Sequence, residues 1–334
     1  MSKSVSEMTK MQHMKGAGIV INTDIPSFIK SSYKLKPDGL IMEELTWRFL
    51  VRNVLRGKNI LLVGPAGCAK TMAAHSVVDA LKRPFFSIPL GSTQDPRSAL
   101  IGNTHFSKEK GTYFASSYFV EAISTPNAVI LLDELSRAHP EAWNLLMPVL
   151  DHTQRFLRLE EREDGATVPV AEGVSFIATA NIGNQYTSTR VLDRALVDRF
   201  TIVEITPLNQ SDEFSLLKKL YPEVSDEFLT ALSSVSAQTR MEAGTEGSKL
   251  TDAISTRLSV ETAGLLADGF SLLEAAEVSI FPFFSNDGGN DSERTYVRQM
   301  VQKYVNPEAP PAEEPVEDDD VLFTKEDIAA ASQP

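Results

Sequence analysis

Five short runs of apolar residues recur between residues 59 and 205, and segments with apolar positions at helical spacing separate them. A run that is apolar at every position is typical of a strand covered on both faces, as in parallel sheets. Strands that alternate with helices favour a doubly wound parallel α/β fold. The predicted strands are 59–63, 85–88, 128–133, 174–180 and 201–205.

The regions around these strands have patterns of their own. Residues 41–55 carry apolar side chains at helical spacing before the first strand, and residues 210–304 are helical in pattern, which predicts a smaller helical lid subdomain. The last residues are rich in proline and acids, as in disordered linkers. The expected parts are a flexible arm over 1–36, an α/β domain over 37–208, a helical lid over 209–305 and an acidic disordered tail over 306–334.

A glycine-rich segment, GPAGCAKT, follows the first predicted strand directly at residues 64–71. Gly64 and Gly67 let the backbone curl so that several N–H groups point at one anion, and the following helix adds its positive dipole end. Lys70 is placed to reach the β- and γ-phosphates of a nucleotide, and the Thr71 hydroxyl is placed to ligate Mg²⁺. The predicted ATP-binding residues of this loop are Gly64, Pro65, Ala66, Gly67, Cys68, Ala69, Lys70, Thr71 and Met72.

Polar side chains end two further predicted strands. Asp133 and Glu134 follow an unbroken apolar run, and ligands of parallel sheets bind outside the carboxyl ends of the strands. Adjacent strand residues point to opposite sides, so these two carboxylates have different tasks. We assign Asp133 to the Mg²⁺ shell and Glu134 to the polarisation of the attacking water. Asn181, at the end of the strand predicted at 174–180, is placed to hydrogen-bond that water or the γ-phosphate.

Three arginines are candidates for contact with phosphate. Arg194 and Arg199 lie in a short helical stretch soon after Asn181, and the guanidinium fork suits phosphate oxygens. One of them is a candidate arginine finger, with Arg199 preferred and Arg194 as the alternative. Arg257 opens a helical segment of the lid, from which it is placed to approach the γ-phosphate. An ordinary solvated arginine is an equally good interpretation of Arg257.

Taken in order, these motifs resemble those of an AAA+ ATPase. They are similar to the MoxR branch, with the CobS-type chelatase ATPases and the CbbQ/NorQ activators, whose members often carry alanine before the P-loop lysine, as Ala69 does here. Residues 92–102, running on to 111–114, resemble the insertion in the second helix of this clade. Residues 155–172 resemble the hairpin that precedes its sensor strand. The resemblance covers residues 37–305.

The resemblance also implies an assembly and a client, for which the motifs themselves give no direct evidence. It implies a ring, expected to be hexameric, in which Arg199 completes the site of the neighbouring subunit and Arg257 couples the nucleotide state to the angle of the lid. It also implies a protein client, expected to contain a von Willebrand factor A domain, and a metal insertion, activation or assembly step.

Composition limits the remaining function classes. No run approaches ~18 apolar residues, so no membrane span is expected, and residues 1–15 lack the apolar stretch of a signal peptide. Cys68 is the single cysteine, which excludes an intramolecular disulfide and suits a reducing cytoplasm. The formal net charge of −13 disfavours general nucleic-acid affinity. Residues 306–334 hold nine of the acids and one lysine, so the rest of the chain is only mildly acidic. Its net charge is therefore compatible with a local basic pore.

The sequence thus predicts a cytoplasmic, Mg²⁺-dependent ATPase with chaperone-like action on a protein client. Two alternatives stay open. One is a nucleic-acid-translocating motor subunit, which a strongly basic pore would favour. The other is a structural assembly clamp that binds nucleotide without turnover, against which the intact Asp133-Glu134 pair argues.

Overall fold

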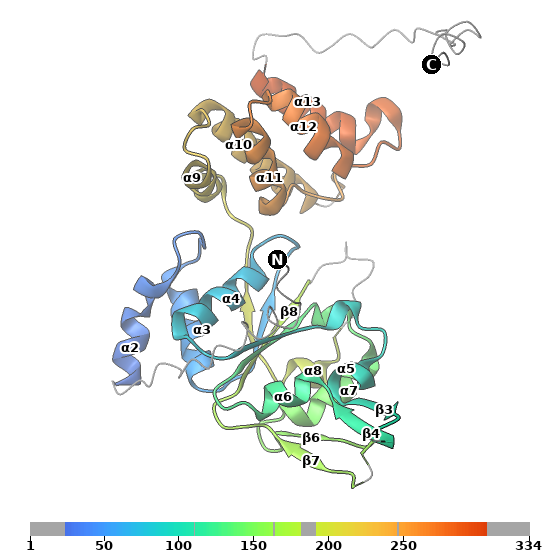
Figure 1. Ribbon diagram of the computed structural model, residues 1–334. Helices are drawn as coiled ribbons and strands as arrows, with labels where there is room; N and C mark the ends of the chain where they lie inside the picture. Colours follow the sequence, from blue (N-terminus) through green and yellow to red (C-terminus); the bar gives the residue numbers. More distant parts are fainter. Residues whose placement is uncertain (1–23, 110, 163, 182–191, 246, 306–334) are drawn as a thin grey trace, which may run out of the picture.

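The computed structural model describes residues 24–109, 111–162, 164–181, 192–245 and 247–305. An α/β domain lies below a helical lid in Figure 1, and the chain that leaves β9 (Thr201–Glu204) joins the two. Most of the predicted arm and the whole predicted tail, residues 1–23 and 306–334, lie outside the described residues.

The end of the predicted arm carries helical structure. It forms α2 (Ile25–Ser31) and the 3₁₀ turn η1 (Ser32–Leu35), which lie beside α3 (Glu44–Leu55). The indole Nε1–H of Trp47 in α3 donates to the carbonyl of Ser32 at 2.8 Å, and both residues are buried. Residues 24–35 are therefore folded against the α/β domain, which the expectation of a flexible arm over 1–36 did not include.

The central sheet contains five parallel strands in the order β2-β5-β8-β1-β9. Every residue of β1 and β8 is buried, which explains why these runs are apolar almost throughout. Each predicted run is a strand, and the doubly wound parallel fold is confirmed. The other four strands are β1 (Ile60–Val63), β2 (Phe85–Pro89), β5 (Val129–Asp133) and β8 (Ser175–Ala180).

Helices cover both faces of this sheet. Alternate side chains of β1 point to opposite faces, so Ile60 and Leu62 join the core beneath α3 and α4 (Lys70–Leu81), whereas Leu61 joins the core on the other face. That second core is covered by α5 (Pro96–Leu100), α6 (Tyr118–Ser124) and α7 (Pro140–Leu150). The sheet is therefore the middle layer of three, and its carboxyl edge stays open to a ligand.

Two hairpins extend from the α/β domain where the insertion and the pre-sensor hairpin were expected (Figure 1). They are β3 (Gly102–Ser107) with β4 (Gly111–Ser116), and β6 (Phe156–Arg158) with β7 (Thr167–Pro169). Arg97 of α5 donates to Glu141 of α7 at 2.8 Å and to Glu161, beyond β6, at 2.9 Å. This arginine ties the base of the first hairpin to the second.

The lid has a hydrophobic core of its own, which includes Leu217, Leu232, Ala263 and Phe281. Serine side chains cap three of its helices by accepting a backbone N–H in the first turn. Among the described residues, no helix is both long and apolar enough to cross a bilayer. The lid elements are α9 (Gln210–Leu220), α10 (Asp226–Ala243), α11 (Thr256–Ala267), α12 (Leu272–Ser279), the 3₁₀ turns η4 (Phe281–Phe283) and η5 (Gly289–Asp291), and α13 (Glu293–Val305).

Candidate nucleotide-binding site

The glycine-rich loop connects the buried strand β1 to α4, as predicted. Its backbone has positive φ at Gly64 (155°), Gly67 (73°) and Ala69 (65°). A Cβ atom on Gly64 would lie 2.1 Å from the carbonyl oxygen of Ile205, so only glycine fits there. The curled loop ends at the N-terminus of α4, where unpaired backbone N–H groups and the helix dipole favour an anion.

Lys70 lies inside this loop. Its Nζ donates to the carbonyls of Gly64 at 2.9 Å and Pro65 at 2.6 Å, and the residue is buried. Burial lowers the pKa of the Lys70 ammonium, while Cys68 and Asp133 oppose that change. The Cys68 thiol donates to the carbonyl of Pro65 at 3.0 Å, and burial raises its pKa. Cys68 therefore packs within the loop as a protonated thiol.

Asp133 ends β5 and meets two hydroxyl groups. Thr71, on the first turn of α4, donates to Asp133 Oδ1 at 3.2 Å, and Thr179 of β8 donates to the same oxygen at 2.6 Å. A carboxylate next to a hydroxyl is a hard-oxygen donor set that suits Mg²⁺, which takes few protein ligands beside substrate phosphates and water. No cluster of three or more His, Cys, Asp or Glu side chains suited to a metal occurs among the described residues, and Mg²⁺ at a phosphate site does not require one.

Glu134 adopts a backbone conformation that is rare for its residue type. Its φ is 56°, and the 3₁₀ turn η3 (Leu135–Arg137) follows it. The Glu134 N–H donates to Thr179 Oγ1 at 2.9 Å, and Arg137 Nη1 lies 3.3 Å from both carboxylate oxygens. Strained backbone of this kind persists where the surroundings hold it, often at functional sites. Glu134 thus lies just outside β5, which ends at Asp133, so the strand alternation from which different sides were predicted for the two carboxylates does not extend to it.

Asn181 follows β8 immediately and is half-buried. The parallel register pairs Val63 with Ala180 and Leu132 with Ala178. Asn181 therefore lies at the carboxyl edge of the sheet, on the strand between the glycine-rich loop and the Asp133-Glu134 pair. This is the position that its proposed contact with water or phosphate requires.

The lid approaches the loop through the segment before α11. A Cβ atom on Gly67 would lie 2.7 Å from Cβ of Ser255 and 3.7 Å from Cβ of Arg257. A cavity of about 610 Å³ opens at this junction, and residues 65–68 and 252–258 line it with Pro207, Arg240 and Phe283. Its volume lies within the range of small-molecule sites. Met72 is 44% exposed on the first turn of α4 and does not line this cavity.

The two candidate fingers lie elsewhere. Arg194 begins α8 (Arg194–Val197) and Arg199 follows its end, and this helix lies away from the start of α4 in Figure 1. Arg199 is 25% exposed at its side chain; it donates to Asp151 at 3.2 Å, to the Met147 carbonyl at 3.2 Å and to the Ala195 carbonyl at 2.6 Å. Arg194 is exposed. The structure therefore brings Arg257 to the loop of its own chain, but neither Arg194 nor Arg199.

Three residues of this arrangement were not predicted from the sequence. Thr179 bonds both carboxylate residues, Ser255 abuts the loop, and a Cβ on Gly91 would lie 2.2 Å from Glu134 Oε2. Thr179 carried a signal, because it is the hydroxyl in an apolar strand two residues before Asn181 and so shares its side of the strand. Gly91 and Ser255 come close to the site only through the tertiary fold.

Known proteins share both parts of this architecture. Residues 59–200 match the AAA domain family of the dynein-related subfamily, and residues 214–302 match the CbbQ/NirQ/NorQ C-terminal domain family. This chain carries an AAA domain followed by a CbbQ/NirQ/NorQ C-terminal domain. The resemblance seen in the motifs is thereby confirmed, and the two matches divide between the α/β domain and the lid.

Individual relatives of this AAA+ chain are distant. It is 28% identical over 272 residues to the "Putative chaperone BssE" of Thauera aromatica, across 80% of this chain and 88% of that protein. It is 29% identical over 175 residues to an uncharacterized protein of Staphylococcus saprophyticus, across 52% of this chain and 64% of that protein. A solved structure of a "putative ATPase" from Cytophaga hutchinsonii superposes with a TM-score of 0.45 at 17% identity, covering 84% of this chain and 94% of that one.

Proposed function

We propose that this AAA+ protein is a Mg²⁺-dependent ATPase that works as a hexameric ring and remodels or activates a protein client. One observation carries the proposal: at the end of a glycine-rich loop, Thr71 bonds Asp133, and Thr179 links Asp133 to the backbone of Glu134. The lid segment at Ser255 lies against the same loop, and residues 65–68 and 252–258 line a cavity beside these side chains. We take residues 37–208 as the nucleotide-binding domain and 209–305 as the lid.

In the proposed reaction, ATP is cleaved by water. Lys70 would neutralise the phosphates, and Thr71 and Asp133 would hold a Mg²⁺ ion, which would supply further positive charge beside the phosphate oxygens. Glu134 accepts a proton from the attacking water, which Asn181 orients. Positioning and charge neutralisation supply nearly all of the acceleration in such reactions.

The ring and the client follow from the family and not from a contact in this chain. Arg199, or Arg194 in its place, is proposed to enter the site of the neighbouring subunit, and Arg257 to link the nucleotide to the lid. Support for a protein client comes from the relative named as a chaperone and from the resemblance to ATPases that act with von Willebrand factor A-domain proteins.

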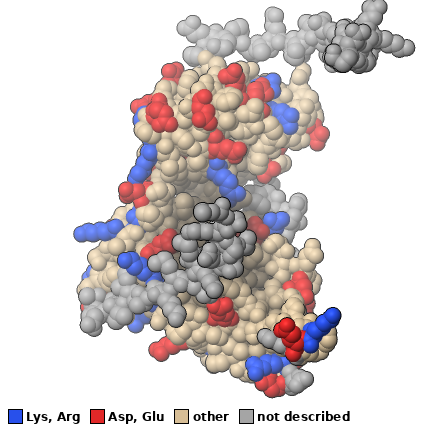
Figure 2. All heavy atoms as spheres, viewed as in Figure 1, with Lys and Arg blue, Asp and Glu red and all other residues tan. Residues whose placement is uncertain are grey.

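Nucleic acid is disfavoured as a client. Lys and Arg side chains are interspersed with Asp and Glu on the face of the molecule in Figure 2, without a continuous basic surface. The formal net charge of −13 points the same way, because proteins that track a phosphate backbone need a positive field along it.

Three variants test the proposal. Lys70→Ala is expected to lose ATP binding, because it removes the buried charge that opposes the phosphates. Glu134→Gln is expected to bind ATP but lose turnover by about 10²–10⁴-fold, the range for removal of a general base. Glu223→Gln, in the exposed turn between α9 and α10, is the matched control. Titration with labelled ATP and phosphate release measure both quantities. Wild-type turnover in Glu134→Gln would refute the role of Glu134, and absence of turnover in the unmodified protein would favour the assembly clamp.

A further inference from the structure

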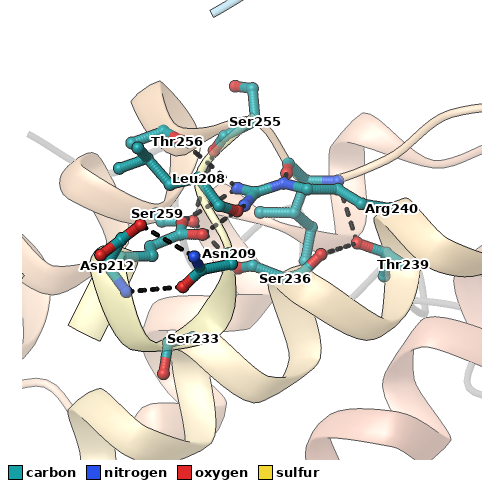
Figure 3. Close-up of polar contacts among 12 residues, drawn as sticks. Leu208, Asn209, Asp212, Ser233, Ser236, Thr239, Arg240, Ser255, Thr256 and Ser259 are labelled. Carbon is teal, nitrogen blue, oxygen red and sulfur yellow. Dashed lines mark hydrogen bonds and ion pairs between the residues drawn. The ribbon is translucent and has the colours of Figure 1, made fainter. Parts of the chain in front are cut away.

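Arg240 of α10 lines the cavity but has all of its hydrogen-bond donors engaged within the protein. Nε donates to the carbonyl of Ile254 at 2.8 Å, and Nη1 donates to the carbonyl of Leu208 at 2.9 Å and to Glu213 Oε2. Nη2 donates to Glu213 Oε1 at 2.9 Å and to Thr256 Oγ1 at 3.5 Å. A guanidinium has five N–H donors, so Arg240 is fully occupied by the lid and the linker (Figure 3).

Glu213 of α9 allows the guanidinium of Arg240 little freedom, because its carboxylate is buried. The residue is 0% exposed, and the Arg240 side chain is 12% exposed. A buried carboxylate without its partner is strongly unfavourable, whereas a bidentate pair with arginine satisfies both oxygens in one plane. A lysine carries the same charge but cannot reproduce the planar fork. The ion pair with Glu213 therefore fixes the orientation of the guanidinium group, and with it the positions of the other groups that accept its hydrogen bonds.

Its other partners lie at the two places where the lid meets the nucleotide site. Leu208 belongs to the linker between β9 and α9, and Ile254 and Thr256 flank Ser255, which abuts Gly67. Thr239, the neighbour of Arg240 on α10, accepts the Ile254 N–H at 3.1 Å and adds a second tie to the same segment (Figure 3). A displacement of Arg240 would therefore move Ser255 and Arg257 relative to the loop.

The same contacts define where the lid can turn. On the side of the α/β domain, the Ile205 N–H donates to the Val63 carbonyl at 2.8 Å and extends the pairing of β9 with β1. On the lid side, Arg240 holds the Leu208 carbonyl. Thr206 and Pro207 are the residues between these two ties, and we call them the hinge because a rotation of the lid would have to be taken up by their backbone.

We propose that Arg240 is a positioning residue of the nucleotide site: paired with Glu213, it fixes the segment around Ser255 to the lid side of the hinge, so that Arg257 reaches the nucleotide only while this clamp is intact. The inference rests on the proposed ATP site. It assigns no contact between Arg240 and the nucleotide itself.

A double-mutant cycle tests the proposal, because residues that act through one another have non-additive effects. Dissociation constants for a fluorescent ATP analogue with Mg²⁺ are measured in the full-length Glu134→Gln protein, so that hydrolysis does not interfere. Arg240→Lys and Arg257→Ala are each expected to weaken binding about tenfold, which corresponds to a typical pairwise coupling. The double variant is expected to bind within about twofold of Arg257→Ala alone.

Arg298→Lys is the matched control, since Arg298 pairs with Glu277 at 3.0 Å on the exposed surface of α12 and α13; its binding should be unchanged. Where circular dichroism shows that Arg240→Lys does not fold, Glu213→Asp carries the same test by withdrawing the carboxylate. The proposal is overturned if Arg240→Lys does not weaken binding of the ATP analogue. It is also overturned if Arg240→Lys weakens binding equally in the presence of Arg257 and in the Arg257→Ala background. Failure of the Glu134→Gln parent to bind nucleotide refutes the ATP site instead.

Discussion

At the scale of single residues, two non-glycine residues of the site have a left-handed backbone conformation. Ala69 has φ 65° and ψ 23° at the N-cap of α4, and Glu134 has φ 56° and ψ 44° before η3. The left-handed region costs an L-residue roughly 1–2 kcal/mol. This cost explains why the general phosphate-loop pattern has glycine immediately before its lysine, at the position of Ala69 in this chain.

Ala69→Gly is therefore expected to stabilise the protein. Glycine removes the steric cost but adds about 0.4–1 kcal/mol of unfolded-chain entropy, so the free energy of unfolding should rise by about 0.5–1 kcal/mol. Denaturant unfolding measures it. Ala80→Gly makes the same change within α4 and should lower stability by about 0.5–1 kcal/mol. Destabilisation by both substitutions would contradict the assigned strain at Ala69.

At the scale of elements, two 3₁₀ turns bring Gly91 and Glu134 together. Gly91 lies in η2 (Leu90–Ser92) at the end of β2, and Glu134 precedes η3 at the end of β5. These strands are neighbours in the sheet, with Pro89 opposite Asp133. The carboxylate of Glu134 lies where a side chain on Gly91 would be. The absence of a Cβ at Gly91 therefore gives Glu134 its place.

Gly91→Ala is expected to lower kcat and leave ATP binding nearly unchanged. The new Cβ would lie 2.2 Å from Glu134 Oε2 and 2.8 Å from Glu134 Cβ, so the whole Glu134 side chain must shift. Small misplacements of a reacting group cost on the order of 10²-fold in rate. Steady-state ATPase assays with a separate binding titration distinguish the two effects. Gly39→Ala, which meets nothing within 4 Å, is the control. An unchanged kcat in Gly91→Ala would show that Glu134 acts from another position.

At the scale of the whole molecule, the placement of Arg199 bears on assembly. The side chain is fixed by Asp151 and by two backbone carbonyls near α7 and α8, and α8 lies away from the loop of its own chain in Figure 1. In the proposed ring, a contact of Arg199 with a phosphate would therefore be made in the site of a neighbouring subunit. Arg194 is more exposed and is the alternative.

Mixed rings test this placement. Arg199→Ala should bind ATP nearly normally and lose on the order of 10³-fold or more in turnover, the range for removal of an arginine finger. Mixing it with Lys70→Ala, which keeps the finger but has no usable pocket, should restore part of the activity wherever an intact Arg199 meets an intact Lys70 site. Arg194→Ala is assayed in parallel. Subunit exchange without recovery, together with an inactive Arg194→Ala, would move the finger to Arg194.

Local patterns determined much of this protein by themselves. A strand buried on both faces must be apolar almost throughout, so the inner strands β1, β5 and β8 were visible as runs before the fold was known. The edge strands β2 and β9 have exposed positions, but enough of their residues are apolar that they were predicted as well. Local sequence also predicted the loop at Gly64, the hydroxyl of Thr71 and the acids Asp133 and Glu134 at the end of β5. The pattern that marks each of them consists of residues adjacent to it in the chain. Asn181 was predicted for the same reason, since it directly follows an apolar run that forms a strand.

The tertiary structure decided which distant residues meet. Gly91 and Ser255 reach the site through a turn and the docking of the lid, and neither of these leaves a periodic signal in the sequence. Thr179 carried a local signal, but only the order of the strands places its hydroxyl against Asp133 and Glu134. Arg240 and Glu213 read as ordinary charged positions on amphipathic helices, and only their burial shows that they form a pair. Burial and contact are sums over segments far apart in the chain, whereas periodicity reports only on neighbours. The strands were therefore readable from the sequence, and the clamp that positions the lid was not.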